Sequence, residues 1–348
     1  MSDDNLSAPL IRELQGFIQE ALNAVTSPLA NFALLDFPQF ANVGDSAIWL
    51  GALRYFCQVH SREPTYVCSQ DSIDYGALER AVPEGALFIQ GGGNFGDLYP
   101  RHQDFRESIV QRFPNHTIVQ LPQSIHFESS RNLDRARRII NGHHYFHLFV
   151  RDRKSYEIAT NSFTCPVHLC PDLAFFLGPL RRPWRPAHNR VFLLRRDKEM
   201  ASSVSPCRAL PGNFVMFDWI KEPLFTCRRI KLKVALNSWF RDAGQFSTAA
   251  LRPIYYRQLA EERLLRGLKL LASGKIVVTD RLHGHILCLL LGIPHFALDN
   301  SYGKISGFID TWTAKCDLVR LPSSLREAAI NEINPMMFAG TGKAIEHE

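Results

Sequence analysis

The sequence contains no apolar run that reaches the roughly 20 residues needed to span a bilayer. Its first 25 residues are acidic and then amphipathic, which is not the pattern of a secretory signal peptide. We expect a surface or crossing helix over residues 11–25. With 46% hydrophobic and 21% charged residues, the composition is that of a folded globular chain and excludes a disordered one.

The eight cysteines form no CxxC pair, and their spacings fit neither a zinc site nor a disulfide framework. Cys288 lies within the apolar run HILCLLL, where a thiol packs as a small hydrophobic side chain. Reduced cysteines are typical of the cytoplasm, so we expect a cytoplasmic protein. No cluster of metal ligands is visible in the sequence, and we expect no metal and no bound cofactor.

The net charge of +6, from 40 basic and 34 acidic residues, is modest for 348 residues. Basic residues nevertheless cluster over 181–185, 195–196 and 228–233. A solvated face, an anionic substrate or the headgroups at the inner face of a membrane would each explain these clusters. The basic residues are scattered and no recognition motif accompanies them, so we expect no nucleic-acid partner.

Strand and helix patterns alternate along the first half, with short β-branched runs such as 86–90 and 117–120 between helical segments. Such alternation predicts parallel sheets covered by helices. The length exceeds one ordinary core, and the proline-rich segment 178–190 is typical of a linker. We therefore predict an α/β fold with two doubly wound Rossmann-like domains facing a cleft. Their bounds are 1–180 and 188–322, and residues 323–348 pack back on the first domain.

The most informative stretch is 276–308, IVVTDRLHGHILCLLLGIPHFALDNSYGKISGF. IVV predicts a buried strand, and a helix begins where Arg281 and His283 stand. Unpaired N–H groups and the helix dipole favour an anion at such a helix start. An arginine can hold a phosphate or carboxylate there by a two-pronged contact, with a titratable imidazole two residues on. The sequence thus predicts an anion site at the end of this strand.

The glycine-rich run 91–97 has the spacing GxGxxG, which raises the question of a dinucleotide site. That site requires an acidic residue at the end of the next strand, and Gln120 to Gln123 stand there instead. We prefer a loop whose backbone N–H groups approach a ligand, with Asn94 and Asp97 facing it. A tight turn capped by Asn94 is the structural alternative.

Polar residues follow several other predicted strands. Asp45 is either a ligand contact or the N-cap of the next helix, and Asp152 is a candidate cap for the helix after it. His126 stands where the cleft should be. Of Arg195 and Arg196, one is expected to reach the cleft and the other to pair with a neighbouring acid. Polar residues at the ends of successive strands favour a binding site there.

Together these residues resemble the polysaccharide pyruvyl transferases. The match spans about residues 36–310 in the family's order, and its most specific part is DRLHGHILCLLLGIP. The motifs that carry it are Gly44-Asp45, GGGNFGD, Gln123-Ser124, Arg151-Asp152 with Ser155, Pro171-Asp172, Asp280-Arg281-Leu282-His283 and Gly292-Ile293-Pro294.

The resemblance implies an architecture like that of the glycosyltransferase B enzymes, with phosphoenolpyruvate as donor. It implies transfer of a pyruvyl group to two hydroxyls of a sugar in a surface polysaccharide or exopolysaccharide, or in its lipid-linked precursor. The products would be a cyclic ketal and phosphate. The first domain would then hold the acceptor and the second the donor. The resemblance also implies that His283 binds the donor, so we expect His285 to have a structural or supporting role.

Phosphoenolpyruvate carries a carboxylate and a phosphate, so its site needs several cations. The predicted catalytic residues are His283 as acid, Arg281 for the leaving phosphate, and Asp97 as base or acceptor partner. The predicted donor-binding residues are Arg195, Arg196, Arg281, Leu282 and His283. The predicted acceptor-binding residues are Asn42, Asp45, Gly93, Asn94, Asp97, Gln123 and His126.

Two other functions are compatible with the same architecture. A glycosyltransferase with a nucleotide-sugar donor would need an acidic residue for the ribose, and Asp299 or Asp310 could serve. A non-catalytic member would bind saccharide without transferring anything to it. The aromatic and basic stretch 200–250 would shape the acceptor side, touch a membrane or pack in the core.

Overall fold

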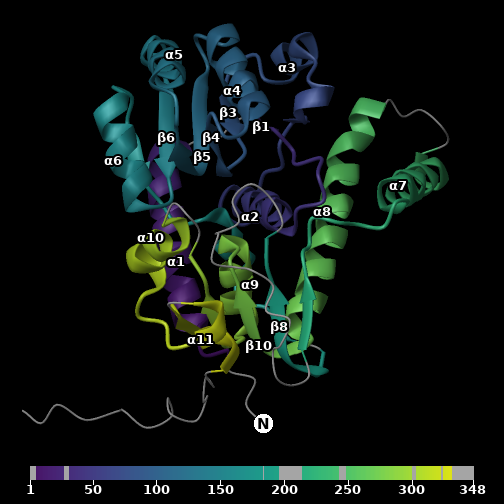
Figure 1. Cartoon of the computed structure of the whole chain (residues 1–348). Coiled ribbons are helices and arrows are strands. Elements are labelled where there is room, and N and C mark those ends of the chain that lie inside the picture. Colours follow the sequence, from purple (N-terminus) through teal and green to yellow (C-terminus); the bar gives the residue numbers. More distant parts are fainter. Residues whose placement is uncertain are drawn as a thin grey trace, which may run out of the picture.

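The computed structural model describes residues 5–26, 31–182, 184–195, 214–242, 248–299, 303–322 and 324–330. It contains two parallel β-sheets with helices packed around them (Figure 1). The first sheet is built from residues 32–169 and the second from residues 188–320. The α/β class predicted from the alternation is confirmed. No helix in the described ranges is long and apolar enough to cross a membrane.

The first sheet has the strand order β2-β1-β3-β5-β6-β7, and β4 also pairs with β5. Its strands are β1 (Phe32–Leu35), β2 (Tyr66–Val67), β3 (Ala86–Ile89), β4 (Gly92–Gly96), β5 (Thr117–His126), β6 (Phe146–Val150) and β7 (Val167–Leu169). Its helices are α2 (Val43–His60), α3 (Tyr75–Ala81), α4 (Pro100–Arg112), α5 (Ser130–Asn141) and α6 (Arg153–Ser162). Leu35 pairs with Ile89, and Ile89 pairs with Gln120, so these strands end at one edge.

Both faces of the first sheet are buried, as the continuous apolar strands predict. Phe32 and Leu34 of β1 belong to one hydrophobic cluster, whereas Ala33 and Leu35 belong to another on the opposite face. The glycine run departs from the prediction. Residues 92–96, expected as a loop, pair with β5 as a strand, and the next helix, α4, begins at Pro100.

The second sheet has the strand order β12-β11-β10-β8-β9. Its strands are β8 (His188–Leu193), β9 (Phe214–Phe217), β10 (Gly274–Thr279), β11 (His295–Ala297) and β12 (Val319–Arg320). Its helices are α7 (Thr226–Asp242), α8 (Thr248–Ala272), α9 (Leu282–Leu291), α10 (Lys304–Phe308) and α11 (Leu325–Ile330). Leu325 and Ala328 of α11 pack on this second sheet. The expected return to the first domain falls chiefly on residues 331–348, which lie outside the described ranges.

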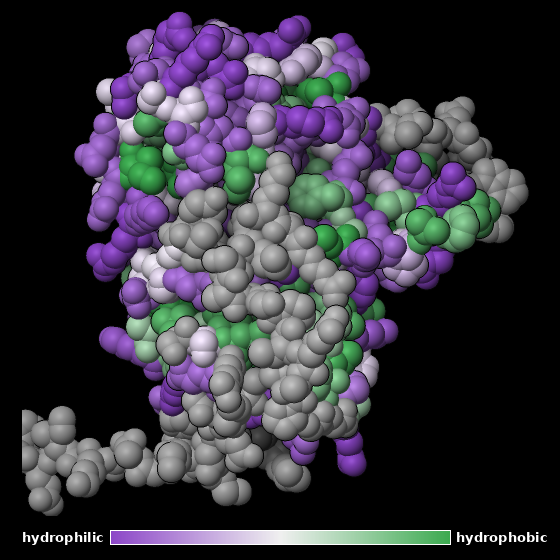
Figure 2. Space-filling view, viewed as in Figure 1, coloured by the Kyte–Doolittle hydropathy of each residue, from purple (hydrophilic) through white to green (hydrophobic). Residues whose placement is uncertain are grey.

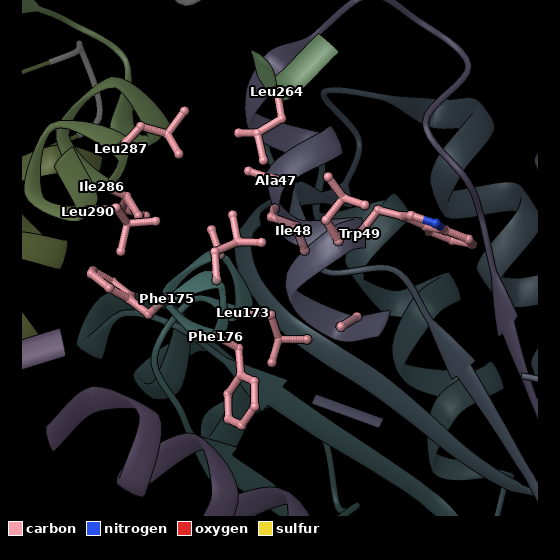
Figure 3. Close-up of a cluster of buried hydrophobic side chains, with 14 of the residues drawn as sticks. Ala47, Ile48, Trp49, Leu173, Phe175, Phe176, Leu264, Ile286, Leu287 and Leu290 are labelled. Carbon is pink, nitrogen blue, oxygen red and sulfur yellow. The ribbon is translucent and has the colours of Figure 1, made fainter. Parts of the chain in front are cut away.

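One hydrophobic cluster joins the two sheets (Figure 3). It draws on α2, on the 3₁₀ turn η2 (Leu173–Leu177), on α8 and on α9. A Cβ at Gly51 of α2 would lie 2.0 Å from the carbonyl oxygen of Leu173, so a glycine is needed where α2 and η2 touch. Helix α1 (Ala8–Thr26) adds Ile11 and Leu14 to the same cluster. The carboxyl ends of the two sheets are thereby held facing each other.

Candidate functional site

A cavity of about 260 Å³ lies between the carboxyl ends of the two sheets. The first half contributes Phe40, Asn42, Asp45, Gly93, Asn94, Tyr99, His102 and Arg151 to its lining. The second half contributes Arg195, Trp219, Ile220, Asp280, Arg281, Leu282, His283, Lys304 and Ile305. Ligands of open parallel sheets sit beyond the strand ends where the strand order reverses. Here these points lie between β1 and β3 and between β8 and β10, whose following loops line the cavity.

The imidazole of His283 is paired with a buried carboxylate. His283 is the second residue of α9, and its Nε2 lies 3.4 Å from Oδ2 of Asp172. Asp172 is fully buried and also accepts hydrogen bonds from Arg151 Nη1 (2.6 Å) and from the N–H of Ala174 (2.9 Å). Burial alone raises the pKa of Asp172, but the charges of His283 and Arg151 and these hydrogen bonds hold it well below its ordinary value. Asp172 is therefore a buried carboxylate held between Arg151 and His283.

Gly44 fixes the other side of that imidazole. A Cβ at this position would lie 2.3 Å from Nδ1 of His283, closer than side-chain atoms pack. The helix that carries Gly44 is capped by Asn42, whose side-chain oxygen accepts the Gly44 N–H at 3.1 Å. Asn42 Nδ2 in turn donates to Asp45 at 2.6 Å. The alternative that Asp45 is the N-cap of α2 is thus wrong, since Asn42 is the N-cap and Asp45 lines the cavity.

Arg151 is held by a chain of polar groups at the ends of β5 and β6. Its Nε donates to Ser124 Oγ at 2.9 Å, and Ser124 donates to Asp152 at 2.7 Å. Asp152 also accepts the Ser155 N–H at 2.8 Å, which confirms its predicted capping of α6. A Cβ at Gly93 would lie 2.3 Å from Lys304 Nζ and 3.1 Å from Arg151 Nη2. The glycine therefore admits two cations side by side.

The predicted anion-binding arginine lies at the start of α9. Arg281 is the residue before the first turn, and its Nη2 lies 2.7 Å from Oδ1 of Asp218, with both side chains buried. Arg195 also lines the cavity, whereas Arg196 lies outside the described ranges. Together with Arg151 and Lys304, these arginines place four cations in the lining, beside the carboxyl groups of Asp45 and Asp280.

Asp280 is a buried carboxyl at the cavity wall. Its Oδ1 accepts the N–H of Arg195 at 2.8 Å, while the buried Oδ2 has no hydrogen-bond partner within the described residues. Burial raises the pKa of Asp280 to about 6, although the Arg195 hydrogen bond acts in the opposite direction. Such a group can take up or release a proton near neutral pH.

Three predicted acceptor residues do not line the cavity. Asp97 accepts hydrogen bonds from the N–H groups of Glu128 (2.9 Å) and Ser129 (2.8 Å), where it ties down the start of α5. Burial raises its pKa, but these bonds outweigh that effect and lower it. Gln123 lies behind the lining and donates to Asn94 Oδ1 at 2.8 Å. His126 lies 3.7 Å from Glu128.

His285 and His295 form a buried pair in the second half. His295 Nδ1 is 2.9 Å from the carbonyl of Ile293, its Nε2 is 2.7 Å from His285 Nδ1, and His285 Nε2 is 3.0 Å from Thr313 Oγ1. Burial lowers both pKa values, that of His295 to about 4. With both rings neutral, His295 donates to Ile293 and accepts from His285, which accepts from Thr313. His285 is thus a structural residue, as expected.

Sequence reasoning missed several residues in and behind the cavity lining. Arg151 and Asp172 stood in the motifs that carry the resemblance, but neither was given a role in the site. Asp280 was part of the DRLH motif and was likewise left out. Lys304 lies in the stretch 276–308 but after its motifs, and Asp218, the partner of Arg281, stands in a segment without a recognisable pattern. A signal for Asp172 existed, because an acidic residue inside the apolar run LCPDLAFFL is costly to bury unless it meets cations.

Comparison with known proteins identifies the family. The profile of the polysaccharide pyruvyl transferases matches residues 42–302. The chain is 35% identical over 309 residues to "Pyruvyl transferase 1" of Schizosaccharomyces pombe (strain 972 / ATCC 24843), covering 82% of this chain and 70% of that protein. It is 33% identical over 290 residues to "Putative pyruvyl transferase EpsO" of Bacillus subtilis (strain 168), covering 82% and 86%.

A solved structure shares the fold. The crystal structure of an uncharacterized protein from Klebsiella pneumoniae subsp. pneumoniae NTUH-K2044 has a TM-score of 0.56 at 18% identity, covering 89% of this chain and 99% of that chain. The profile match and the two relatives establish that the chain belongs to the polysaccharide pyruvyl transferase family. It is accordingly an enzyme, a pyruvyl transferase, and its family implies a saccharide acceptor.

Proposed function

We propose that the enzyme transfers the pyruvyl group of phosphoenolpyruvate to two hydroxyls of a sugar, forming a cyclic ketal and releasing phosphate. The sugar belongs to a surface polysaccharide or exopolysaccharide, or to its lipid-linked precursor. The observation that carries this proposal is the convergence of cationic side chains on a buried imidazole–carboxylate pair. A donor with both a carboxylate and a phosphate matches that lining, because each anion needs a cation of its own.

In this proposal the donor lies against the start of α9, and its anions contact Arg281 and Arg195. The lining residues of the first half, among them Asn42, Asp45 and Asn94, would contact the sugar. The architecture that holds donor and acceptor would be two doubly wound domains of the glycosyltransferase B type. Phosphoenolpyruvate is a co-substrate, and the proposed reaction uses no further cofactor.

The proton balance assigns roles to the residues. His283, whose imidazole contacts Asp172, gives a proton to the methylene carbon of the donor. The first sugar hydroxyl bonds to the neighbouring carbon, and the second hydroxyl then displaces phosphate from it. One hydroxyl proton returns to His283, and the other passes through Asp280 to the leaving phosphate. The arginines stabilise the charge that develops on the leaving group.

We assign the acceptance of a hydroxyl proton to Asp280 rather than to Asp97. Asp280 lines the cavity with a carboxyl oxygen that has no hydrogen-bond partner among the described residues. Its pKa of about 6 suits proton exchange near neutral pH. Asp97 instead satisfies backbone N–H groups at α5.

The test is phosphate release from phosphoenolpyruvate, with and without galactosyl, glucosyl and mannosyl acceptors. Acceptor-dependent release is expected. His283→Ala should abolish it while phosphoenolpyruvate still raises the melting temperature, and the exposed His144→Ala serves as the matched control. Undiminished release by His283→Ala would remove His283 from the mechanism. Neither release nor a thermal shift with phosphoenolpyruvate would overturn the proposed donor.

A nucleotide-sugar donor fits the cavity less well. Neither Asp299 nor Asp310, the acids suggested for the ribose, lines it. Asp299 accepts the N–H of Ile305 at 3.1 Å, at the start of α10. Thermal shifts with nucleotide sugars, measured beside those with phosphoenolpyruvate, compare the two donors directly.

We also propose that the reaction takes place in the cytoplasm, with the enzyme peripheral at the inner face of a membrane. A lipid-linked acceptor is anchored there and presents its sugar to a protein at the surface. The basic and apolar residues downstream of β9 support this location.

A further inference from the structure

Helix α7 projects from the body of the molecule (Figure 1). Apolar side chains lie on two of its faces. Ile230 and Val234 are buried in the cluster that includes residues of α8. Phe225, just before the helix, and Leu232 and Leu236 are 67%, 61% and 46% exposed. Leu232 and Leu236 are four residues apart, so they lie on one side of α7, opposite Ile230 and Val234.

Cations surround this outer stripe. Residues 223–237 contain four basic residues and no acidic one. The basic residues are Arg228, Arg229, Lys231 and Lys233, and all four are exposed. Arg229 contacts Glu262 of α8 at 2.5 Å. Figure 2 shows hydrophobic and hydrophilic side chains side by side on this projecting part of the surface.

The segment before α7 is also a wall of the donor cavity. Trp219 and Ile220 line that cavity, and Leu224, four residues on from Ile220, is 91% exposed. Two arginines of α8 hold the segment in place. Arg266 donates to the carbonyls of Trp219 and Ala41, each at 2.7 Å. The position of α7 is therefore fixed relative to the mouth of the cavity.

Arg263 of α8 also connects the segment before α7 to the loop between β1 and α2. Its Nη1 donates to the carbonyl of Pro38 at 2.8 Å, and its Nε donates to Glu222 at 2.9 Å. Pro38 belongs to the loop between β1 and α2, and Glu222 to the segment that leads into α7. A surface bound by α7 would thus be held at a set distance from the cavity.

We propose that the outer face of α7, formed by Leu224, Phe225, Leu232 and Leu236 with the surrounding cations, docks on an anionic lipid bilayer. An apolar stripe flanked by Lys and Arg is the pattern of helices that lie in a membrane interface, where anionic headgroups attract the cations. Docking would set the cavity mouth beside lipid-linked saccharides. This inference rests on the proposed function for the nature of the acceptor.

A second copy of the chain fits the same face less well. A two-fold contact through α7 would bring the same patch of each copy together. Arg229 is paired with Glu262, and Lys231 lies 5.5 Å from the ring centroid of Tyr255. The two-fold contact would therefore bring Arg228 and Lys233 of one copy against the same cations of the other, with no acidic residue between 223 and 237 to compensate. An anionic bilayer offers the opposite charge over a broad area.

The experiment is co-sedimentation of the full-length enzyme with vesicles of phosphatidylcholine alone and with phosphatidylglycerol added. Binding to the anionic vesicles only, weakened by salt, is expected. Lys233→Glu should weaken binding at least about fivefold, the effect of removing one cation at the surface. Leu232→Glu with Leu236→Glu should abolish it. The matched control is Leu6→Glu with Leu321→Glu, which changes two exposed leucines elsewhere and should bind as the wild type does.

Phosphate release with a water-soluble acceptor is measured on the same variants and should stay unchanged, since α7 does not line the cavity. This assay fails if the proposed function is wrong, whereas the vesicle assay fails if the docking surface is wrong. Absence of vesicle binding at low salt would overturn the inference. Binding that the α7 variants leave intact would also overturn it. So would a dimer in sedimentation velocity that these variants dissociate.

Discussion

Gly44→Ala tests whether the position of His283 controls the chemistry. The added Cβ would lie 2.3 Å from Nδ1 and 2.5 Å from Cγ of the imidazole, whereas ordinary contacts are 3.4–4 Å. The ring must therefore shift by about 1 Å, which disturbs its 3.4 Å contact with Asp172. A misplacement of that size costs about 100-fold in rate, and loss of an acid–base catalyst costs about 100- to 10,000-fold. We expect kcat to fall at least about 100-fold.

The variant should still fold, although the overlap, which includes the Cβ of His283 at 2.8 Å, costs about 1–3 kcal/mol. Gly44 lies in α2 with an ordinary helical backbone, and alanine is a better helix former than glycine. The matched control is Gly16→Ala in α1, where an added Cβ meets nothing within 4 Å. It should keep full activity and gain a few tenths to about 1 kcal/mol in stability.

The assay is steady-state phosphate release, together with thermal unfolding of each variant. Because Gly44→Ala and His283→Ala act on the same group, their double variant should be no slower than His283→Ala alone. A folded Gly44→Ala enzyme whose kcat stays within about threefold of the wild type would refute the reasoning. An additive double variant would show that Gly44 acts through something other than the imidazole.

Three further predictions concern the buried charges. Asp172→Asn should lower kcat and also reduce the free energy of unfolding by about 3 kcal/mol, because Arg151 loses its buried carboxylate; an unchanged denaturation midpoint would contradict this. Arg281→Lys should raise the KM for phosphoenolpyruvate at least about tenfold, since a point charge cannot replace a two-pronged contact; calorimetry that finds the same donor affinity would remove Arg281 from the donor site. His295 has a pKa of about 4 when folded against 6.5 when unfolded, so the unfolded chain binds the proton first. The free energy of unfolding should have its full value above pH 6.5 and fall by about 3 kcal/mol toward pH 4. A His295→Gln variant whose free energy of unfolding, measured by urea titration, depends on pH in the same way would contradict the assignment.

The strand and helix that carry the predicted donor residues were predictable because every local signal there agrees. Ile276 to Val278 are β-branched, with Val277 and Val278 buried, the helix starts after Arg281, and Gly292 ends it in the left-handed conformation. Strand β4 was not predictable, because the glycines at 92, 93 and 96 have little strand propensity and form a strand only by pairing with β5. Pro253 lies inside α8 and would predict a break there, so the sequence does not indicate one continuous helix.

The candidate site was predictable in its location but not in all its members. Polar residues at strand ends indicated the correct edge of the sheets, and Asn42, Asp45, Gly93 and Asn94 do line the cavity. Asp97 was expected there because it ends the glycine run. The register of β4, with Gly96 beside His126, instead carries it to the start of α5, where N–H groups satisfy its carboxylate. No sequence pattern specifies such a register.

The apolar junction between the two sheets limits how new acceptor specificities can arise in this chain. Ala47 and Ile48 of α2 share one core with Ile286 and Leu290 of α9, so neither half keeps a complete interior by itself (Figure 3). A chimera that joins one half to the other half of a relative would have to match both sides of that core. Exposed side chains at the cavity rim meet no such constraint, and Phe40, for example, is 47% exposed. Specificity can therefore change through single rim side chains, whereas recombination of whole halves should yield unfolded protein.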